Sequence, residues 1–86
     1  MPFFVYIIQS EIDNSYYKGY SENVFQRLLQ HNSGDCEYTK NRCPWRLVYY
    51  EEHETKRSAL IREKNLKKAT RTRIEALISS NKNLMK

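Results

Sequence analysis

The stretch FFVYIIQSEIDNSYYKGY, residues 3–20, decides the fold of this chain. It begins with six consecutive apolar residues, Phe3 to Ile8, whose aromatic and β-branched side chains predict a strand buried on both faces. Residues 11–15 have the composition of a turn. The segment from Tyr16 to Tyr20 then predicts a second strand that returns antiparallel to the first. The chain therefore opens with a β-hairpin whose loop is longer than two residues.

A helix is predicted directly after this hairpin. Ser21 is a good N-cap residue for it, and the sequence Asn32-Ser33-Gly34 ends it, with Gly34 suited to the left-handed cap position. The helical spacing of four apolar side chains predicts its buried stripe, made of Val24, Phe25, Leu28 and Leu29.

A polar loop over residues 35–44 separates this helix from a third strand, Trp45 to Tyr50. Strand alternation places alternate side chains on opposite faces: Trp45, Leu47 and Tyr49 on one, Arg46, Val48 and Tyr50 on the other.

Two more helices complete the predicted order. Thr55 is a suitable N-cap for a helix that runs to about Lys68, and Thr70 caps a last helix that carries Ile74, Leu77 and Ile78. The polar tail from Ser79 is expected to be frayed. The order β-β-α-β-α-α predicts an α+β fold, a small antiparallel three-stranded sheet flanked by helices. The 86 residues form one domain, 1–86, with its core at about residues 3–78.

Composition restricts the class of protein further. The chain is 40% hydrophobic and 29% charged, as globular proteins are. Its two cysteines are too few for the disulfide bonds that stabilise small secreted proteins, so we expect reduced thiols. No stretch approaches the length of a membrane span, and no basic region precedes the first apolar run. We therefore expect a soluble, unprocessed, cytoplasmic protein.

The positive charge of the chain is concentrated in one segment. The whole chain has a net charge of +5, whereas residues 56–73 alone carry eight lysines and arginines against the single carboxylate of Glu63. Such a stripe is typical of a protein that binds a polyanion. The alternative is a solvated helix face, although such a face usually mixes charges to form i,i+4 pairs.

Five polar residues stand at positions that a simple core would leave apolar or uncharged. Glu63 shares a helix face with Ala59 and Leu66, so it needs a partner: a cation such as Arg27 or a neighbouring lysine, or a metal ion. Arg27 and His31 are four residues apart on the first helix and project together. They are either a surface pair or a phosphate site.

The two tyrosines of this set lie in the hairpin. Tyr6 is in the middle of an apolar strand, where its hydroxyl needs a partner. Tyr17 precedes Gly19, which allows another backbone or a ligand to approach closely. Each tyrosine alone is more commonly a half-buried sheet aromatic than a catalytic group.

Taken in order, these residues resemble the GIY-YIG nuclease family. The segments Phe4-Val5-Tyr6 and Tyr17-Lys18-Gly19 stand where that family has its two tripeptides, followed by Arg27, His31 and Glu63. The segments 30–34, 38–39, 44–45, 47–49, 62–64 and 66–68 resemble its small, stand-alone bacterial branch of the UPF0213 type. The resemblance covers residues 3–78. The chain departs from the family at Phe4, where a glycine is usual, and around Glu75, where many members have an asparagine.

The resemblance implies a phosphodiesterase that acts on DNA with one Mg²⁺ or Mn²⁺ ion. Glu63 would hold the ion, and Arg27 would bind the scissile phosphate. Tyr17 would position or deprotonate the attacking water, His31 would accept a proton from a tyrosine or orient it, and Tyr6 would bond in the same cluster. We expect no appended DNA-recognition domain, so specificity would come from branched or flapped DNA structure or from a protein partner. The predicted nucleic-acid contacts are basic: Lys18, Lys56, Arg62, Lys64, Lys67, Lys68 and Arg71.

Three other functions remain open from the sequence. The same fold could bind nucleic acid without turnover through phosphate neutralisation alone. A zinc site could use His31, Cys36, Cys43 and His53, although the paired Cys-x-x-Cys unit is missing. An interaction protein with no nucleic-acid role is the third, and the charge of residues 56–73 argues against it.

Overall fold

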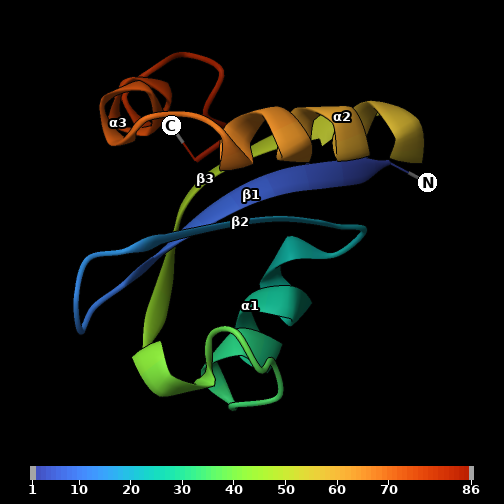
Figure 1. Cartoon of the computed structure of the whole chain (residues 1–86). Helices are drawn as coiled ribbons and strands as arrows, with labels where there is room; N and C mark the ends of the chain where they lie inside the picture. The colour runs from blue at the N-terminus through green and yellow to red at the C-terminus, as the bar shows by residue number, and fades with distance from the viewer. Residues whose placement is uncertain (1, 86) are drawn as a thin grey trace.

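Three antiparallel strands form one sheet in the order β2-β1-β3 at the centre of the molecule (Figure 1). The structure is a computed structural model and describes residues 2–85. Its elements confirm the predicted order and the α+β class, with a short 3-10 helix added before the last strand. The strands are β1 (Phe3–Ser10), β2 (Tyr16–Ser21) and β3 (Trp45–His53); the helices are α1 (Val24–Asn32), η1 (Lys40–Arg42), α2 (Lys56–Lys67) and α3 (Arg71–Ile78).

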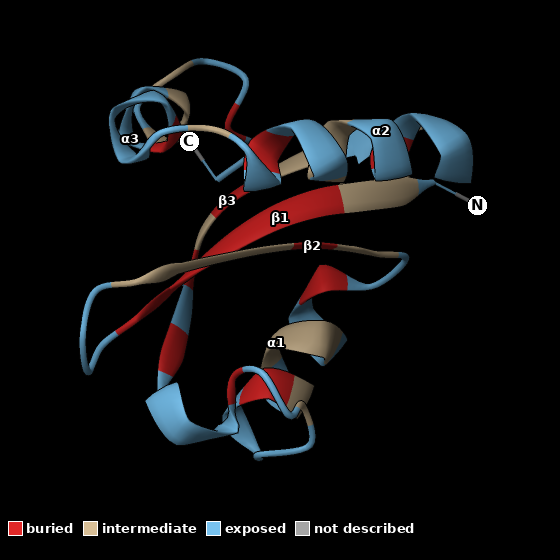
Figure 2. Cartoon of the chain, viewed as in Figure 1, coloured by how far each residue is buried: buried red, intermediate tan, exposed pale blue. Residues whose placement is uncertain are grey.

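The central strand β1 separates two small cores. Figure 1 shows α1 on one face of the sheet and α2 and α3 on the other. Val5 and Ile7 are buried on the α2 face, whereas Tyr6 and Ile8 are buried on the α1 face. Figure 2 shows the resulting buried band along β1. The prediction of a strand buried on both faces is confirmed, because each face has a helix to cover it.

A bulge in β3 overturns the predicted faces of that strand. Ile7 pairs with Tyr49, but the next residue, Ile8, pairs with Leu47, so Val48 is an extra residue in the ladder. Trp45 and Leu47 consequently lie in the core on the α1 face, whereas Tyr49 lies in the core under α2 and α3. Strict alternation would place Trp45, Leu47 and Tyr49 on the same face. The extra residue, Val48, moves the side chains that follow it to the opposite face.

The first helix begins later than predicted, and a different set of its side chains faces the sheet. Its N-cap is Asn23, whose side chain accepts from Gln26 N, while Ser21 ends β2. Phe25 and Leu29 are 62% and 70% exposed, which contradicts the predicted stripe. The buried face instead contains Val24, the half-buried Leu28 and the fully buried His31, spaced i, i+4 and i+7. Gly34 follows the helix with a φ of 85°, as predicted.

The two C-terminal helices begin as predicted. The hydroxyls of Thr55 and Thr70 accept from Ser58 N and Arg73 N, respectively, and so cap α2 and α3. Within residues 2–85, no helix is long and apolar enough to cross a membrane.

The polar tail, expected to be frayed, is bound to the sheet. The amide of Asn83 is buried and donates to the carbonyl oxygens of Val48 and Ile78, both at 2.9 Å. Leu84 N also donates to Tyr50 O at 3.0 Å. Val48 is the bulged residue, so the tail satisfies a carbonyl beside a break in the β3 ladder.

Candidate active site

The pairing of β1 with β2 brings the two tripeptides into contact. Tyr6 lies directly opposite Gly19, and Ile8 lies opposite Tyr17, so both tyrosines point to the α1 face. A Cβ atom at position 19 would lie 2.6 Å from the Tyr6 hydroxyl and 2.7 Å from its ring carbon Cζ. Only glycine leaves room for this ring. The group that approaches Gly19 closely is therefore the side chain of Tyr6.

His31 connects this hairpin to the loop after α1. Its Nε2 lies 2.9 Å from the Tyr6 hydroxyl, and its Nδ1 lies 2.8 Å from the Thr39 hydroxyl. Thr39 also donates to Cys36 O at 3.4 Å, so its single hydroxyl proton is used there. Thr39 therefore accepts from Nδ1–H, and Nε2 accepts from the hydroxyl of Tyr6. Thr39 belongs to the segment 38–39 that resembles the family, but the sequence does not predict its contact with His31, because that contact depends on how the loop folds back.

Burial and charge keep this chain of hydrogen bonds uncharged at neutral pH. Burial, followed by the positive charge of Arg27, lowers the pKa of His31 to about 4. Burial, followed by the neighbouring Tyr17, raises the pKa of Tyr6 well above its usual value, although Arg27 opposes this. His31 is thus a neutral acceptor and Tyr6 a neutral donor.

Tyr17 and Arg27 border the same cluster. The ring of Tyr17 packs edge-on against those of His31 and Trp45, with centroid distances of 5.0 and 6.4 Å. Burial raises the pKa of Tyr17, and the charge of Arg27 partly counteracts it. The half-buried Arg27 donates from Nη1 to Gln30 Oε1 at 2.8 Å. Its guanidinium therefore has a neutral partner and acts electrostatically on Tyr6, Tyr17 and His31.

Glu63 lies on the helix that covers the other face of the sheet. It lies on α2, near the edge strand β2, with a side chain only 17% exposed. Its negative charge is one of the smaller causes that raise the pKa of Tyr17, after burial. It pairs with Lys67 at 3.8 Å, and no ion pair within residues 2–85 joins it to Arg27. Tyr6, Tyr17 and His31 are thus in contact, and Arg27 acts on all three electrostatically. Within residues 2–85, no hydrogen bond or ion pair joins Glu63 to these four residues.

The donor set fits a weakly held hydrated ion. Within residues 2–85 no three His, Cys, Asp or Glu side chains come together as a metal cage. A single carboxylate suits Mg²⁺, which keeps several waters and takes a phosphate oxygen as a further ligand. Glu63 supplies one such carboxylate, which is half-buried and pairs with Lys67 at 3.8 Å.

The zinc alternative is wrong for the described residues. Both ring nitrogens of His31 are used by Tyr6 and Thr39. His53 bonds to Glu51 and Ser58, in the α2-facing part of the molecule. Cys36 and Cys43 are free thiols, as expected, and Cys43 donates to His31 O.

The predicted nucleic-acid contacts lie on β2, on α2 with its C-cap residue Lys68, and on α3. Lys18 lies near Lys67, and its pKa is lowered by burial and by that second charge. Arg71 stacks 4.7 Å from the Tyr16 ring centroid and donates to Asn14 O at 3.1 Å. Arg62 is ion-paired with Glu51. The remaining three, Lys56, Lys64 and Lys68, are exposed.

The fold and this cluster define a small basic α+β domain with a tyrosine, arginine and histidine site beside a helical glutamate. The model of the GIY-YIG catalytic domain matches residues 2–76. The chain belongs to the GIY-YIG family, and within it to the UPF0213 group. A GIY-YIG domain has a nuclease-like fold, and nucleases of this family generally use divalent metal ions.

Its relatives are similar over most of their length. UPF0213 protein CPE1444 of Clostridium perfringens is 44% identical over 78 residues, which is 90% of this chain and 83% of the relative. UPF0213 protein SA0446 of Staphylococcus aureus is 46% identical over 76 residues, with 87% and 92% covered. The solution NMR structure of UPF0213 protein BH0048 from Bacillus halodurans has a TM-score of 0.61 and 34% identity, and the match covers 99% of this chain and 90% of that one. These names state no activity.

Proposed function

We propose that this protein is a divalent-metal-dependent endonuclease that hydrolyses DNA phosphodiester bonds and selects DNA by its structure. The observation that carries the proposal is the contact of Tyr6, Tyr17 and His31 under the positive charge of Arg27, with Glu63 acting electrostatically on Tyr17. A structural core would not need a buried tyrosine–histidine–threonine chain next to a guanidinium.

Each residue has a role that follows from its environment. Glu63 would hold one Mg²⁺ or Mn²⁺ ion, which when bound neutralises charge on the phosphate. Arg27 would bind the scissile phosphate with its planar fork and stabilise the charge that develops on it. Its present bond to the neutral Gln30 is weaker than a bond to phosphate, so a substrate can displace it.

In this proposal, Tyr17 and the Tyr6–His31 pair orient the attacking water and the proton-bearing groups. The raised pKa of Tyr17 keeps its proton in place, so its hydroxyl would orient the attacking water and would lose its proton only against added positive charge. The proton of Tyr6 is directed at His31, which leaves the oxygen of Tyr6 as an acceptor facing Arg27. The pKa of His31, about 4, disfavours its protonation at neutral pH, so in this proposal His31 orients the hydroxyl of Tyr6.

One observation favours a second candidate, a non-catalytic nucleic-acid-binding module. Burial and the charge of Glu63 both raise the pKa of Tyr17, which disfavours it as a base. The basic residues of α2 would bind phosphates whether or not turnover occurs.

The two candidates separate in a cleavage assay with flapped, branched, single-stranded and linear duplex DNA. We expect the wild type to cut at least one substrate with Mg²⁺ or Mn²⁺ and none with EDTA. Glu63→Gln should reduce cleavage by at least about 100-fold, as removal of a group that stabilises the transition state does. Its DNA binding should change by less than about threefold, since phosphate contacts elsewhere supply affinity.

The matched control is Glu75→Gln, which removes an exposed carboxylate from α3. It should cleave like the wild type. If the wild type binds DNA but cuts none of the four substrates, the protein is the non-catalytic binding module. If the Glu63→Gln variant is fully active, Glu63 does not hold the metal ion.

A further inference from the structure

Three basic side chains surround a common region on the face that carries α2 and α3. Arg62 and Lys82 line a depression of about 460 Å³ between β3, α2 and the tail. Arg62 and Arg73 line a second, of about 270 Å³, between α2 and α3. Arg73 and Lys82 line a third, of about 470 Å³, along α3. Arg62 is common to the first and second depressions, Arg73 to the second and third, and Lys82 to the first and third. The three positive charges therefore lie around one region of the surface.

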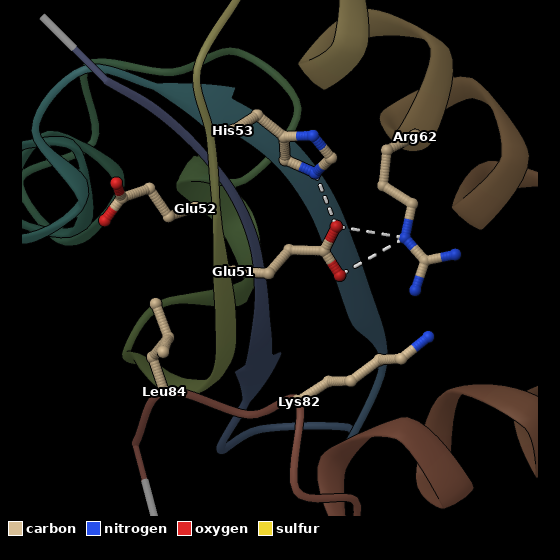
Figure 3. Close-up of a pocket in the computed structure, with 6 residues that line it drawn as sticks. All are labelled: Glu51, Glu52, His53, Arg62, Lys82 and Leu84. Atoms are coloured by element: carbon tan, nitrogen blue, oxygen red, sulfur yellow. Dashed lines mark hydrogen bonds and ion pairs between the residues drawn. The ribbon is translucent and has the colours of Figure 1, made fainter.

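Arg62 is held in place by a carboxylate beneath it. Its Nε lies 3.2 and 3.1 Å from the two oxygens of Glu51, which also accepts from His53 at 2.5 Å and from the Tyr49 hydroxyl. Burial alone would raise the pKa of Glu51, but the bonds from Tyr49 and His53 and the charge of Arg62 outweigh it and hold that pKa below its usual value. Figure 3 shows the terminal nitrogens of Arg62 turned away from Glu51 and Lys82 extending toward them.

The other basic groups of this region lack partners. The side chains of Lys68, Arg73 and Lys82 are exposed and make no ion pair or hydrogen bond within residues 2–85. Glu51 is already bonded, and Glu52 points to the other side of β3 in Figure 3. Positive charge is therefore in excess, and an anion would relieve the repulsion.

We propose that Arg62, Lys68, Arg73 and Lys82 form a second phosphate-binding surface, the α2–α3 cationic groove, for nucleic acid. The inference rests on the proposed nuclease function. The tyrosine–histidine cluster lies on the α1 face, whereas this groove lies on the opposite face of a molecule with extents of 31 × 29 × 24 Å. Nucleic acid that contacts both the tyrosine–histidine cluster and the groove has to extend from one face of the sheet to the other. The groove takes a second segment of a bent or branched nucleic acid, which gives the domain a way to select DNA structure without reading bases.

The test is a triple variant, Lys68→Ala/Arg73→Ala/Lys82→Ala, which leaves Arg62 and its partners intact. Binding to a labelled three-way junction and to a short single-stranded oligonucleotide is measured by fluorescence anisotropy in EDTA, across a range of salt. Junction affinity should fall at least about 10-fold, and the magnitude of the slope of log K against log salt should fall by about 2 to 3, because each removed cation neutralises about one phosphate. Oligonucleotide affinity should change less than about twofold, because a short single strand reaches only one site.

The control is Lys40→Ala/Arg42→Ala/Arg46→Ala, which removes three exposed charges from the α1 end of the molecule. An equal loss of junction affinity in this control would assign the effect to net charge and overturn the groove. Unchanged junction binding in the triple variant would also overturn the proposal. So would a competition experiment in which polyglutamate displaces the labelled junction from the wild type as effectively as unlabelled junction does. A wild type that binds but never cleaves would remove only the catalytic proposal, since no metal is present in the binding assay.

Discussion

The hydroxyl of Tyr6 lies 2.9 Å from Nε2 of His31 and links the first strand to the first helix inside the core. The two residues are 25 positions apart in the sequence. Both side chains are buried, so this hydrogen bond satisfies the hydroxyl of Tyr6 and the Nε2 atom of His31.

Tyr6→Phe removes the donor and leaves a buried acceptor on His31. We expect the free energy of unfolding to fall by about 1 to 3 kcal/mol, the cost of an unsatisfied buried polar group. Urea denaturation measures it. Tyr38→Phe, at a tyrosine that is 81% exposed, should change stability by less than about 0.5 kcal/mol. Equal effects in the two variants would contradict the bond.

Acid should destabilise the protein through His31. Its folded pKa of about 4 lies below the ordinary value of 6.5, so between these values the unfolded chain binds more protons. Stability is therefore full above about pH 6.5 and falls as the pH drops toward 4, by at most about 3 kcal/mol. Denaturation curves at several pH values measure this slope. The slope should flatten in His31→Gln, and a variant with the wild-type slope would place the titration elsewhere.

Gly19→Ala should disrupt the hairpin at the site. The new Cβ would lie within 2.7 Å of two atoms of the Tyr6 side chain, which is fully buried and cannot move aside. We expect a loss of about 1 to 3 kcal/mol in the free energy of unfolding, as for other overpacked cores. At Gly34, which has a positive φ but open space around it, Gly34→Asn is the matched control. Asparagine tolerates this conformation, so the control should remain close to the wild type.

Arg27→Lys keeps the positive charge but removes the planar fork. We expect the rate of DNA cleavage to fall by about 10²- to 10³-fold, typical for loss of a preorganised donor to the developing charge. Binding of DNA should change little, because the total charge is unaltered. Single-turnover cleavage and anisotropy measure the two quantities separately. Wild-type cleavage by this variant would reduce Arg27 to a general electrostatic role.

Asn83→Ala should release the C-terminal tail. The buried amide donates to Val48 O and Ile78 O, so both carbonyls lose a partner. We expect a loss of about 1 to 3 kcal/mol and faster hydrogen exchange at Leu84, whose amide bonds to Tyr50 O. Asn81→Ala, at an exposed position two residues earlier, should have no such effect. A frayed tail would make the two variants alike.

The sequence by itself determined the order of the elements, the hydrophobic nature of β1 and the capping of α2 and α3 by Thr55 and Thr70. These features depend on local periodicity and on side chains that bond within four residues. The order of Tyr6, Tyr17, Arg27, His31 and Glu63 also resembled that of the GIY-YIG family, and this resemblance implied a single site.

Only the tertiary structure decided which side chains meet. The bulge at Val48, the burial of His31 where Phe25 and Leu29 were expected, and the docking of Asn83 depend on contacts between distant segments. The bond from His31 to Thr39 and the convergence of Arg62, Arg73 and Lys82 depend on loops and on a tail that no short-range pattern constrains. Such contacts are fixed by packing and by the satisfaction of buried polar groups, which act across the whole domain.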